Sequence, residues 1–176
     1  DSLSPTMQAT RRRIIEGAKL ALANRGIAAT TVEDILKAAE VSRRTYYQYF
    51  KSKIDLLEAI YEDSAELLLG LMSKSLKEVD LDKKLTSTVD AYLAYQREGG
   101  ALVIALQAEA VRPESRLSGR RDRTLDAIVA MIDANVREVL HLKIDPLAYR
   151  ALLMAIDCMV IDLQRDGTFT MRDSDR

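Results

Sequence analysis

The sequence has little of what enzymes and secreted proteins use for chemistry or covalent stabilisation. It holds one cysteine, Cys158, and one histidine, His141, among 176 residues. A single cysteine excludes an intramolecular disulfide, and one cysteine with one histidine cannot supply the ligands of a zinc site. We therefore expect no metal, no cofactor and a reducing, cytoplasmic environment.

Membrane-spanning segments and helix-breaking residues are equally scarce. No run of about 18 apolar residues could cross a bilayer, and only three prolines and seven glycines occur. Alanine, leucine, glutamate, lysine and arginine abound, which favours long helices. No alternating strand pattern is present. These features predict an all-α protein that does not contact a membrane.

The chain has no net excess of positive charge overall, but it has one at its N-terminal end. The net charge is −1, yet residues 1–55 hold ten Lys and Arg against six Asp and Glu. Residues 56–176 hold sixteen against twenty-one. This asymmetry indicates an N-terminal module that meets an anion.

Apolar spacing and capping residues predict four helices at this basic end. The second is short and ends near Glu40, the third is shorter still and ends near Gln48, and the fourth is long. Glu33, three residues after Thr30, has the spacing of a capping box. Two short helices joined by a tight turn and resting on a first helix form a helix-turn-helix, whose second helix enters the DNA major groove. The predicted caps of the four helices are Thr10, Thr30, Ser42 and Ser52.

The stretch SRRTYYQYFKSK, residues 42–53, combines aromatic rings with cations. Aromatics at helical spacing often belong to a core, and we assign Tyr46 and Phe50 to it. Successive helical residues turn by about 100°, so Tyr47 and Tyr49 must face elsewhere, toward the cations. Arginines at the start of such a helix can bind guanine, and hydroxyl or amide groups can reach phosphates.

The run TTVEDILKAAEVSRRTYYQYFKSKIDLLEAI resembles the N-terminal DNA-binding domain of TetR-family transcriptional repressors, over about residues 10–60. In such regulators the third helix reads DNA, and the C-terminal helices bind an inducer and pair two protomers. The resemblance implies phosphate contacts at Thr31, Tyr47, Tyr49 and Lys53 and base-facing positions at Arg43 and Arg44. Together with the chemistry of the stretch itself, it predicts a DNA-binding set of Thr31, Arg43, Arg44, Thr45, Tyr47, Gln48, Tyr49 and Lys53.

Two positions depart from the family pattern. The family usually has glycine where Glu40 stands and a small residue where Arg44 stands. Glu40 would then adopt a left-handed turn conformation, which costs roughly 1 kcal/mol for a residue with a side chain. Either that strain is accepted or the turn differs locally from the family's. Arg44 adds a long cation to the predicted DNA face.

The predicted helix at 146–165 is apolar nearly all round, so it must be covered on all sides. We expect one side to be buried on its own chain and the other to meet a second copy in a two-fold four-helix bundle, to which the predicted helix at about 120–142 also belongs. The alternative is a central helix within a monomer. The predicted dimerisation residues are Ile132, Val136, Leu152, Ala155, Ile156, Met159 and Leu163.

A small-molecule effector would lie between the helices that follow the DNA-binding module. Its predicted lining residues are Met72, Tyr92, Tyr95, Gln96 and Gln107, each of which could also be ordinary core or surface. We expect residues 1–53 to form the helix-turn-helix domain and residues 54–176 to form a helical effector-binding and dimerisation domain.

Together with these patterns, the resemblance implies a DNA-binding repressor that binds an inverted-repeat operator as a homodimer and is released by an unknown small effector. The alternative is a DNA-binding adaptor controlled by a protein partner. An enzyme is not expected, because the sequence offers no paired nucleophile and base, no glycine-rich phosphate loop and no two-histidine metal motif.

Overall fold

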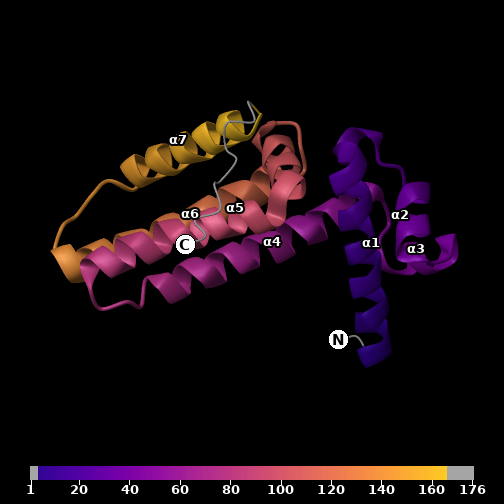
Figure 1. Ribbon diagram of the computed structural model, residues 1–176, viewed down its shortest axis with the longest axis horizontal. Helices are drawn as coiled ribbons and strands as arrows, with labels where there is room; N and C mark the ends of the chain where they lie inside the picture. The colour runs from indigo at the N-terminus through magenta and orange to yellow at the C-terminus, as the bar shows by residue number, and fades with distance from the viewer. Residues whose placement is uncertain (1–3, 166–176) are drawn as a thin grey trace, which may run out of the picture. The chain divides into compact units, whose positions relative to one another are not determined.

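The computed structural model describes residues 4–165 and, within them, every side chain except those of Ile161 and residues 163–165. The described chain is all-α, as predicted, and none of its helices is long and apolar enough to cross a membrane. Figure 1 shows the helices in chain order. They are α1 (Pro5–Ala29), α2 (Val32–Ala39), α3 (Arg43–Tyr49), α4 (Lys53–Ser75), α5 (Leu81–Val111), α6 (Ser118–Leu140) and α7 (Pro146–Arg165).

The chain divides into two compact units, Asp1–Arg121 and Asp122–Arg176. The first unit contains α1 to α5 and the first turn of α6. The second contains the rest of α6 and α7. The division by role that the sequence suggested, after residue 53, stays a prediction.

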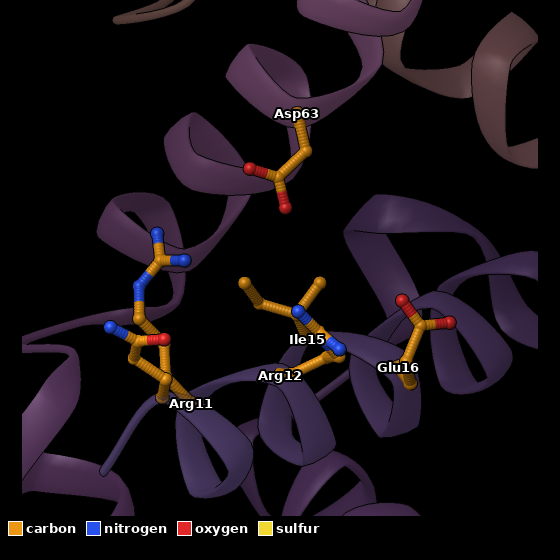
Figure 2. Close-up of a pocket in the computed structure, with 6 residues that line it drawn as sticks. Arg11, Arg12, Ile15, Glu16 and Asp63 are labelled. Carbon is orange, nitrogen blue, oxygen red and sulfur yellow. The ribbon is translucent and has the colours of Figure 1, made fainter. Parts of the chain in front are cut away.

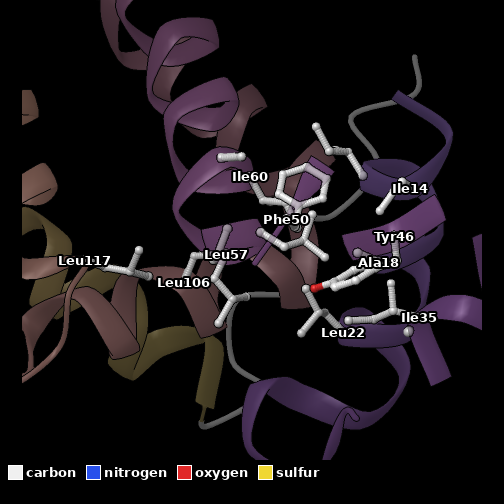
Figure 3. Packing of buried hydrophobic residues seen from close by; sticks show 14 of the residues in the cluster. Ile14, Ala18, Leu22, Ile35, Tyr46, Phe50, Leu57, Ile60, Leu106 and Leu117 are labelled. Atoms are coloured by element: carbon white, nitrogen blue, oxygen red, sulfur yellow. The ribbon is translucent and has the colours of Figure 1, made fainter. Parts of the chain in front are cut away.

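The first unit has a continuous apolar core (Figure 3). It joins the three N-terminal helices to the first turns of α4 and to the end of α5, so the helix-turn-helix rests on the helices that follow it. Gly17 lets α2 approach α1 closely, because a Cβ there would lie 2.5 Å from the Ala39 nitrogen. The most deeply buried members are Ile14, Ala18, Leu22, Ile35, Tyr46, Leu56, Leu57, Ile60, Leu106 and Leu117.

Two of the four predicted helix caps are confirmed and two are wrong. The Ser42 and Ser52 hydroxyls accept hydrogen bonds from the backbone N–H of Thr45 and Asp55. The first helix, however, starts at Pro5 with Ser4 as its cap, because proline fits the first helical position, where its missing N–H is no loss. Thr10 lies inside α1, where its hydroxyl donates to the Thr6 carbonyl.

The capping box of α2 is also one residue later than predicted. Thr31 and Asp34 form it reciprocally, not Thr30 and Glu33. Thr30 is buried, and its hydroxyl donates to the carbonyls of Ala21 and Gly26 instead. The correction leaves the Glu33 side chain free of a capping role.

In the sequence, Gly99 and Gly100 predict a break within the fifth helix, and Asp145 followed by Pro146 predicts the cap of the last helix. Both predictions are confirmed. The backbone of α5 leaves helical geometry at Gly100, with φ 49° and ψ −141°. The Asp145 carboxylate accepts a hydrogen bond from the Leu147 N–H, one residue past Pro146 at the start of α7.

Candidate nucleic-acid interface

The turn between α2 and α3 has the left-handed conformation that the sequence predicted. Glu40 adopts φ 52° and ψ 46°. The N–H of Val41 donates to the Leu36 carbonyl at 3.1 Å, which closes the end of α2. The chain then reverses in two residues, so Ser42 can cap α3 directly.

The two faces of α3 divide as the aromatic spacing predicted for Tyr46, Tyr47 and Phe50. The prediction that Tyr49 faces away from the core is wrong, because this residue is half-buried and packs against the core. Tyr46 and Phe50 are buried, and the Tyr46 hydroxyl donates to the Ser52 carbonyl at 3.1 Å. Burial raises the pKa of Tyr46 to about 12. The opposite face is exposed and carries Arg43, Arg44, Tyr47 and Gln48.

Thr45 and Tyr49 lie at the edge between these faces. Both are half-buried, and Tyr49 packs against the core. The Thr45 hydroxyl forms a hydrogen bond with the Ser42 hydroxyl at 2.8 Å. The structure therefore brings four of the predicted DNA-binding residues fully onto the exposed face of α3 and leaves these two beside it.

Thr31 lies at the N-terminus of α2, where its hydroxyl takes part in the capping box. That hydroxyl donates to the Asp34 carboxylate at 2.6 Å. Hydrogen bonds from the Thr31 hydroxyl and backbone N–H lower the pKa of Asp34. Asp34 is also ion-paired with Arg25. Thr31 is thus held in place by its own helix, and it remains exposed to solvent.

Lys53 has a role that the sequence did not reveal. Its ammonium group donates to the carbonyls of Ile27 and Thr30, at 2.9 and 2.8 Å. These carbonyls end α1, so Lys53 ties the C-terminus of α1 to the N-terminus of α4. An ammonium group has three donors, so one N–H is left over for a phosphate.

The two arginines at the start of α3 differ in their surroundings. An Arg43 Nη2 donates to a Glu33 carboxylate oxygen at 2.6 Å. Among the described residues, no ion pair or hydrogen bond of the Arg44 guanidinium is found. The sequence offered no signal for the first contact, because ten residues and the turn geometry separate its partners.

A cleft of about 440 Å³ opens between α1 and α4, as Figure 2 shows. The Asp63 side chain faces it from α4, opposite Arg11, Arg12, Ile15 and Glu16 from α1. None of the predicted DNA-binding or effector residues lines it. Arg11 also places its guanidinium carbon 5.7 Å from the centre of the Phe50 ring, so it joins α1 to the end of α3.

Four of the predicted effector residues lie together in the first unit. The Gln96 amide nitrogen donates to the Tyr92 hydroxyl at 2.8 Å and to the Gln107 side-chain oxygen at 3.4 Å. Gln96 is 1% exposed, and its own side-chain oxygen has no hydrogen-bond partner. The preceding residue, Tyr95, forms a hydrogen bond with Ser64 of α4 at 2.7 Å. Met72 is buried two turns further along α4.

The predicted dimerisation residues lie in the second unit and are largely uncovered. Leu152 and Met159 are 60% and 61% exposed, and Ala155 is also exposed. Ile132, Val136 and Ile156 are half-buried. The side chain of Leu163 lies outside the described part of the chain.

An ionic cluster that the sequence did not reveal fixes the connection before α6 onto α4. Arg116 binds Asp55 at 3.1 Å and Glu58 at 2.9 Å. Arg120 binds the same Glu58 at 3.2 Å and also Glu62. Glu58 is the centre of the cluster, with a side chain only 12% exposed. The cluster therefore holds the first turns of α4, the helix that Lys53 begins.

Comparison with known families and proteins agrees with this geometry. Residues 14–60 match the family model described as "Bacterial regulatory proteins, tetR family". That range runs from the middle of α1 to the second turn of α4. It therefore contains the whole predicted DNA-binding face.

Individual relatives match over different lengths. The HTH-type transcriptional regulator TtgR of Pseudomonas putida is 40% identical over 75 residues, which are 42% of this chain and 36% of that protein. The match thus spans about a third of the length of that curated relative. Among solved structures, Salmonella enterica GusR is 27% identical, with a TM-score of 0.75 over 92% of this chain and 85% of that one.

A more distant neighbour shows the fold alone. The transcriptional regulator FadR from Bacillus subtilis, solved in complex with stearoyl-CoA, is 21% identical. Its TM-score is 0.77, over 90% of this chain and 89% of that one. The helical arrangement after residue 60 thus has solved counterparts even where sequence identity is low.

Proposed function

Because the chain belongs, through its N-terminal domain, to the TetR family of bacterial regulatory proteins, we propose that it binds duplex DNA as a transcriptional regulator in the cytoplasm. The exposed face of α3 carries the proposal. Arg43 and Arg44 stand at its N-terminal end, where a recognition helix contacts base edges. Tyr47 and Gln48 follow one turn later with groups that can bind phosphates or bases.

The surrounding elements supply phosphate contacts on both sides of α3. Thr31 begins α2, and Lys53 begins α4 with one ammonium donor uncommitted. Free N–H groups at helix N-termini attract anions. We therefore assign Thr31, Lys53 and Tyr47 to the DNA backbone and Arg43 and Arg44 to the groove, with Thr45 and Tyr49 holding the helix from its edge.

We further propose that the protein acts as a homodimer through α6 and α7. Leu147, Leu152 and Met159 leave a large apolar surface on α7 that the described chain does not cover. Two-fold pairing would place two recognition helices about 34–36 Å apart, on successive major-groove faces of one side of the duplex. The operator is then an inverted repeat.

Release by a small-molecule effector is the part of the proposal that depends on the helices after residue 60. The uncommitted oxygen of Gln96 supports it, because a buried acceptor without a partner is unfavourable and a bound molecule with a donor group would satisfy it. The stearoyl-CoA complex of the FadR neighbour shows that a protein of this fold can hold a ligand. We favour repression relieved by such an effector over control by a protein partner.

The test is selection of bound duplexes from a random pool, followed by titration of the selected DNA. Tyr47→Ala should weaken binding to all sequences, whereas Arg44→Ala should weaken it and reduce its dependence on salt. Arg123→Ala is a matched control, because it removes an exposed cation from α6 and leaves α3 unaltered. Equal affinities for both α3 variants, the control and the unmodified protein would refute the assignment.

A further inference from the structure

The contact between Glu33 and Arg43 joins the two helices of the helix-turn-helix across their exposed side. Glu33 lies in the first turn of α2, Arg43 is the first residue of α3, and their side chains meet at 2.6 Å. Both side chains are more than half exposed. We infer that Glu33 is a specificity-determining residue that acts through Arg43, and this inference rests on the proposed DNA-binding function.

The geometry of arginine explains how one carboxylate can do this. The guanidinium group is a flat fork of five N–H donors, so fixing one of them fixes the plane of the others. Glu33 occupies a single donor, at Nη2. The remaining donors stay available for a guanine edge, which arginine binds through two parallel hydrogen bonds. Holding the side chain before DNA arrives lowers the entropy lost on binding.

The negative charge of Glu33 also favours contacts of Arg43 with bases over contacts with phosphates. A carboxylate beside the guanidinium offsets its positive charge and repels the phosphate backbone, so Arg43 contributes less to binding that ignores sequence. Arg44, the next residue, has no such neighbour among the described residues and keeps its full attraction for phosphate. The pair thus directs Arg43 toward base edges, whereas Arg44 in the same groove contributes more to binding that ignores sequence.

A structural role for Glu33 has a different signature. Acidic residues in the first turn of a helix stabilise it through the helix dipole, and Glu33 occupies such a position. Removal of that effect would lower thermal stability without changing which DNA sequence is preferred. The test must therefore measure sequence discrimination as well as stability.

The experiment compares Glu33→Gln, Arg43→Ala and the double variant with the unmodified protein. Each is titrated with the selected operator, with every single-base change of one half-site, and with a random duplex at one salt concentration. Arg43→Ala should lose about tenfold discrimination at one base pair, the amount that one bidentate contact provides. Glu33→Gln should lose about two- to fivefold at the same base pair, the range of an exposed ion pair, and should bind the random duplex more tightly.

Glu40→Gln is the matched control, because it removes one carboxylate from the same helix-turn-helix without touching Arg43. It should leave discrimination at that base pair unchanged. In the Arg43→Ala background, Glu33→Gln should also have no effect on discrimination. Arg43→Lys, which keeps the charge but lacks the fork, should bind the random duplex well and lose the base preference.

Several results would overturn the inference. These are equal effects of Glu33→Gln and Glu40→Gln, an undiminished effect of Glu33→Gln without Arg43, or unmodified discrimination in Arg43→Lys. A change in melting temperature for Glu33→Gln with unaltered base preference would likewise assign Glu33 to helix stability alone. If the unmodified protein selects no DNA at all, the proposed function itself fails, which is a separate outcome.

Discussion

In the helix-turn-helix, Ile14, Ile35 and Tyr46 have no exposed surface, whereas in α7 Leu147, Leu152 and Met159 are 60–70% exposed. Both regions are rich in apolar residues at helical spacing. The N-terminal helices cover one another and rest on α4 and α5, so their core is complete within one chain. Helix α7 has more apolar faces than the described chain can cover. The first region thus buries its apolar side chains within one copy of the protein, whereas α7 leaves apolar side chains exposed among the described residues.

The largest expected effect comes from charging the uncovered face of α7. Ala155→Arg would bury an unpaired cation in the proposed dimer interface, which is strongly unfavourable. We expect loss of the dimer and a drop of at least about 100-fold in operator affinity, since one protomer then meets only one half-site. Sedimentation and circular dichroism should be measured together. A dimer that persists, or a loss of helicity, would show that this face is not the interface.

A pair of truncations sharpens the contrast between the two regions. Ile35→Ala removes a fully buried side chain and should lower the free energy of unfolding by about 2–5 kcal/mol at any protein concentration. The loss of stability caused by Leu152→Ala should instead depend on protein concentration, because this side chain acts on the association of two copies. Denaturant titrations at two widely separated protein concentrations distinguish these behaviours. If the loss of stability is independent of protein concentration in both variants, the proposed difference between the two regions is wrong.

Removal of one hydroxyl tests how tightly α3 is fixed to the start of α4. Tyr46→Phe deletes the hydrogen bond to the Ser52 carbonyl and should cost about 0.5–1.5 kcal/mol near neutral pH. The pKa of Tyr46 is raised to about 12 in the folded protein. The neutral tyrosine therefore favours the folded state below about pH 10, and that contribution is lost as pH rises toward about 12. Between about pH 10 and about pH 12 the unmodified protein should therefore lose more stability than the Tyr46→Phe variant. If both proteins lose stability equally over this range, the Tyr46 hydroxyl is in contact with solvent.

The smallest expected effect is an unchanged or higher stability, whereas the preceding substitutions lower it. Glu40 has a positive φ of 52°, so Glu40→Gly removes strain and should leave the free energy of unfolding unchanged or raise it by up to about 1 kcal/mol. Ala38→Gly, two residues earlier in α2, should lower it by about 0.5–1 kcal/mol, since glycine is unfavourable inside a helix. Thermal melts of the two variants compare them directly. A clear loss of stability in Glu40→Gly would show that this turn is held by contacts of the glutamate side chain.

The sequence predicted the helices and the turn where local chemistry decides the structure. Ser42 and Ser52 cap their helices as expected, Gly100 interrupts α5, and Glu40 adopts the left-handed conformation. Each of these features depends on a few neighbouring residues. The resemblance to a family agreed with the role of α3 that the helix-turn-helix pattern and the cluster of arginines and tyrosines had already indicated.

The sequence-based predictions were wrong or incomplete where the structure depends on residues distant in the sequence or on two residues that compete for one role. Ser4 followed by Pro5 is a start signal for α1 that the predicted cap at Thr10 overlooked. Adjacent threonines competed for the α2 cap, and burial of Thr30 decided the outcome. The contacts of Lys53 with α1 and of Glu33 with Arg43 join residues 10–26 positions apart. No sequence spacing reveals such contacts before the fold is known.

The most direct test of the whole interpretation is the composition of the protein–DNA complex on the selected operator. The mass of the complex should be measured by sedimentation or native mass spectrometry, once on a duplex that carries the full site and once on a duplex of equal length that carries a single half-site. We expect two protomers on an inverted repeat and at least about 100-fold weaker binding to the half-site, because the second contact becomes intramolecular in the dimer. One protomer bound tightly to a site without a repeat would contradict both the dimer through α6 and α7 and the operator proposed here.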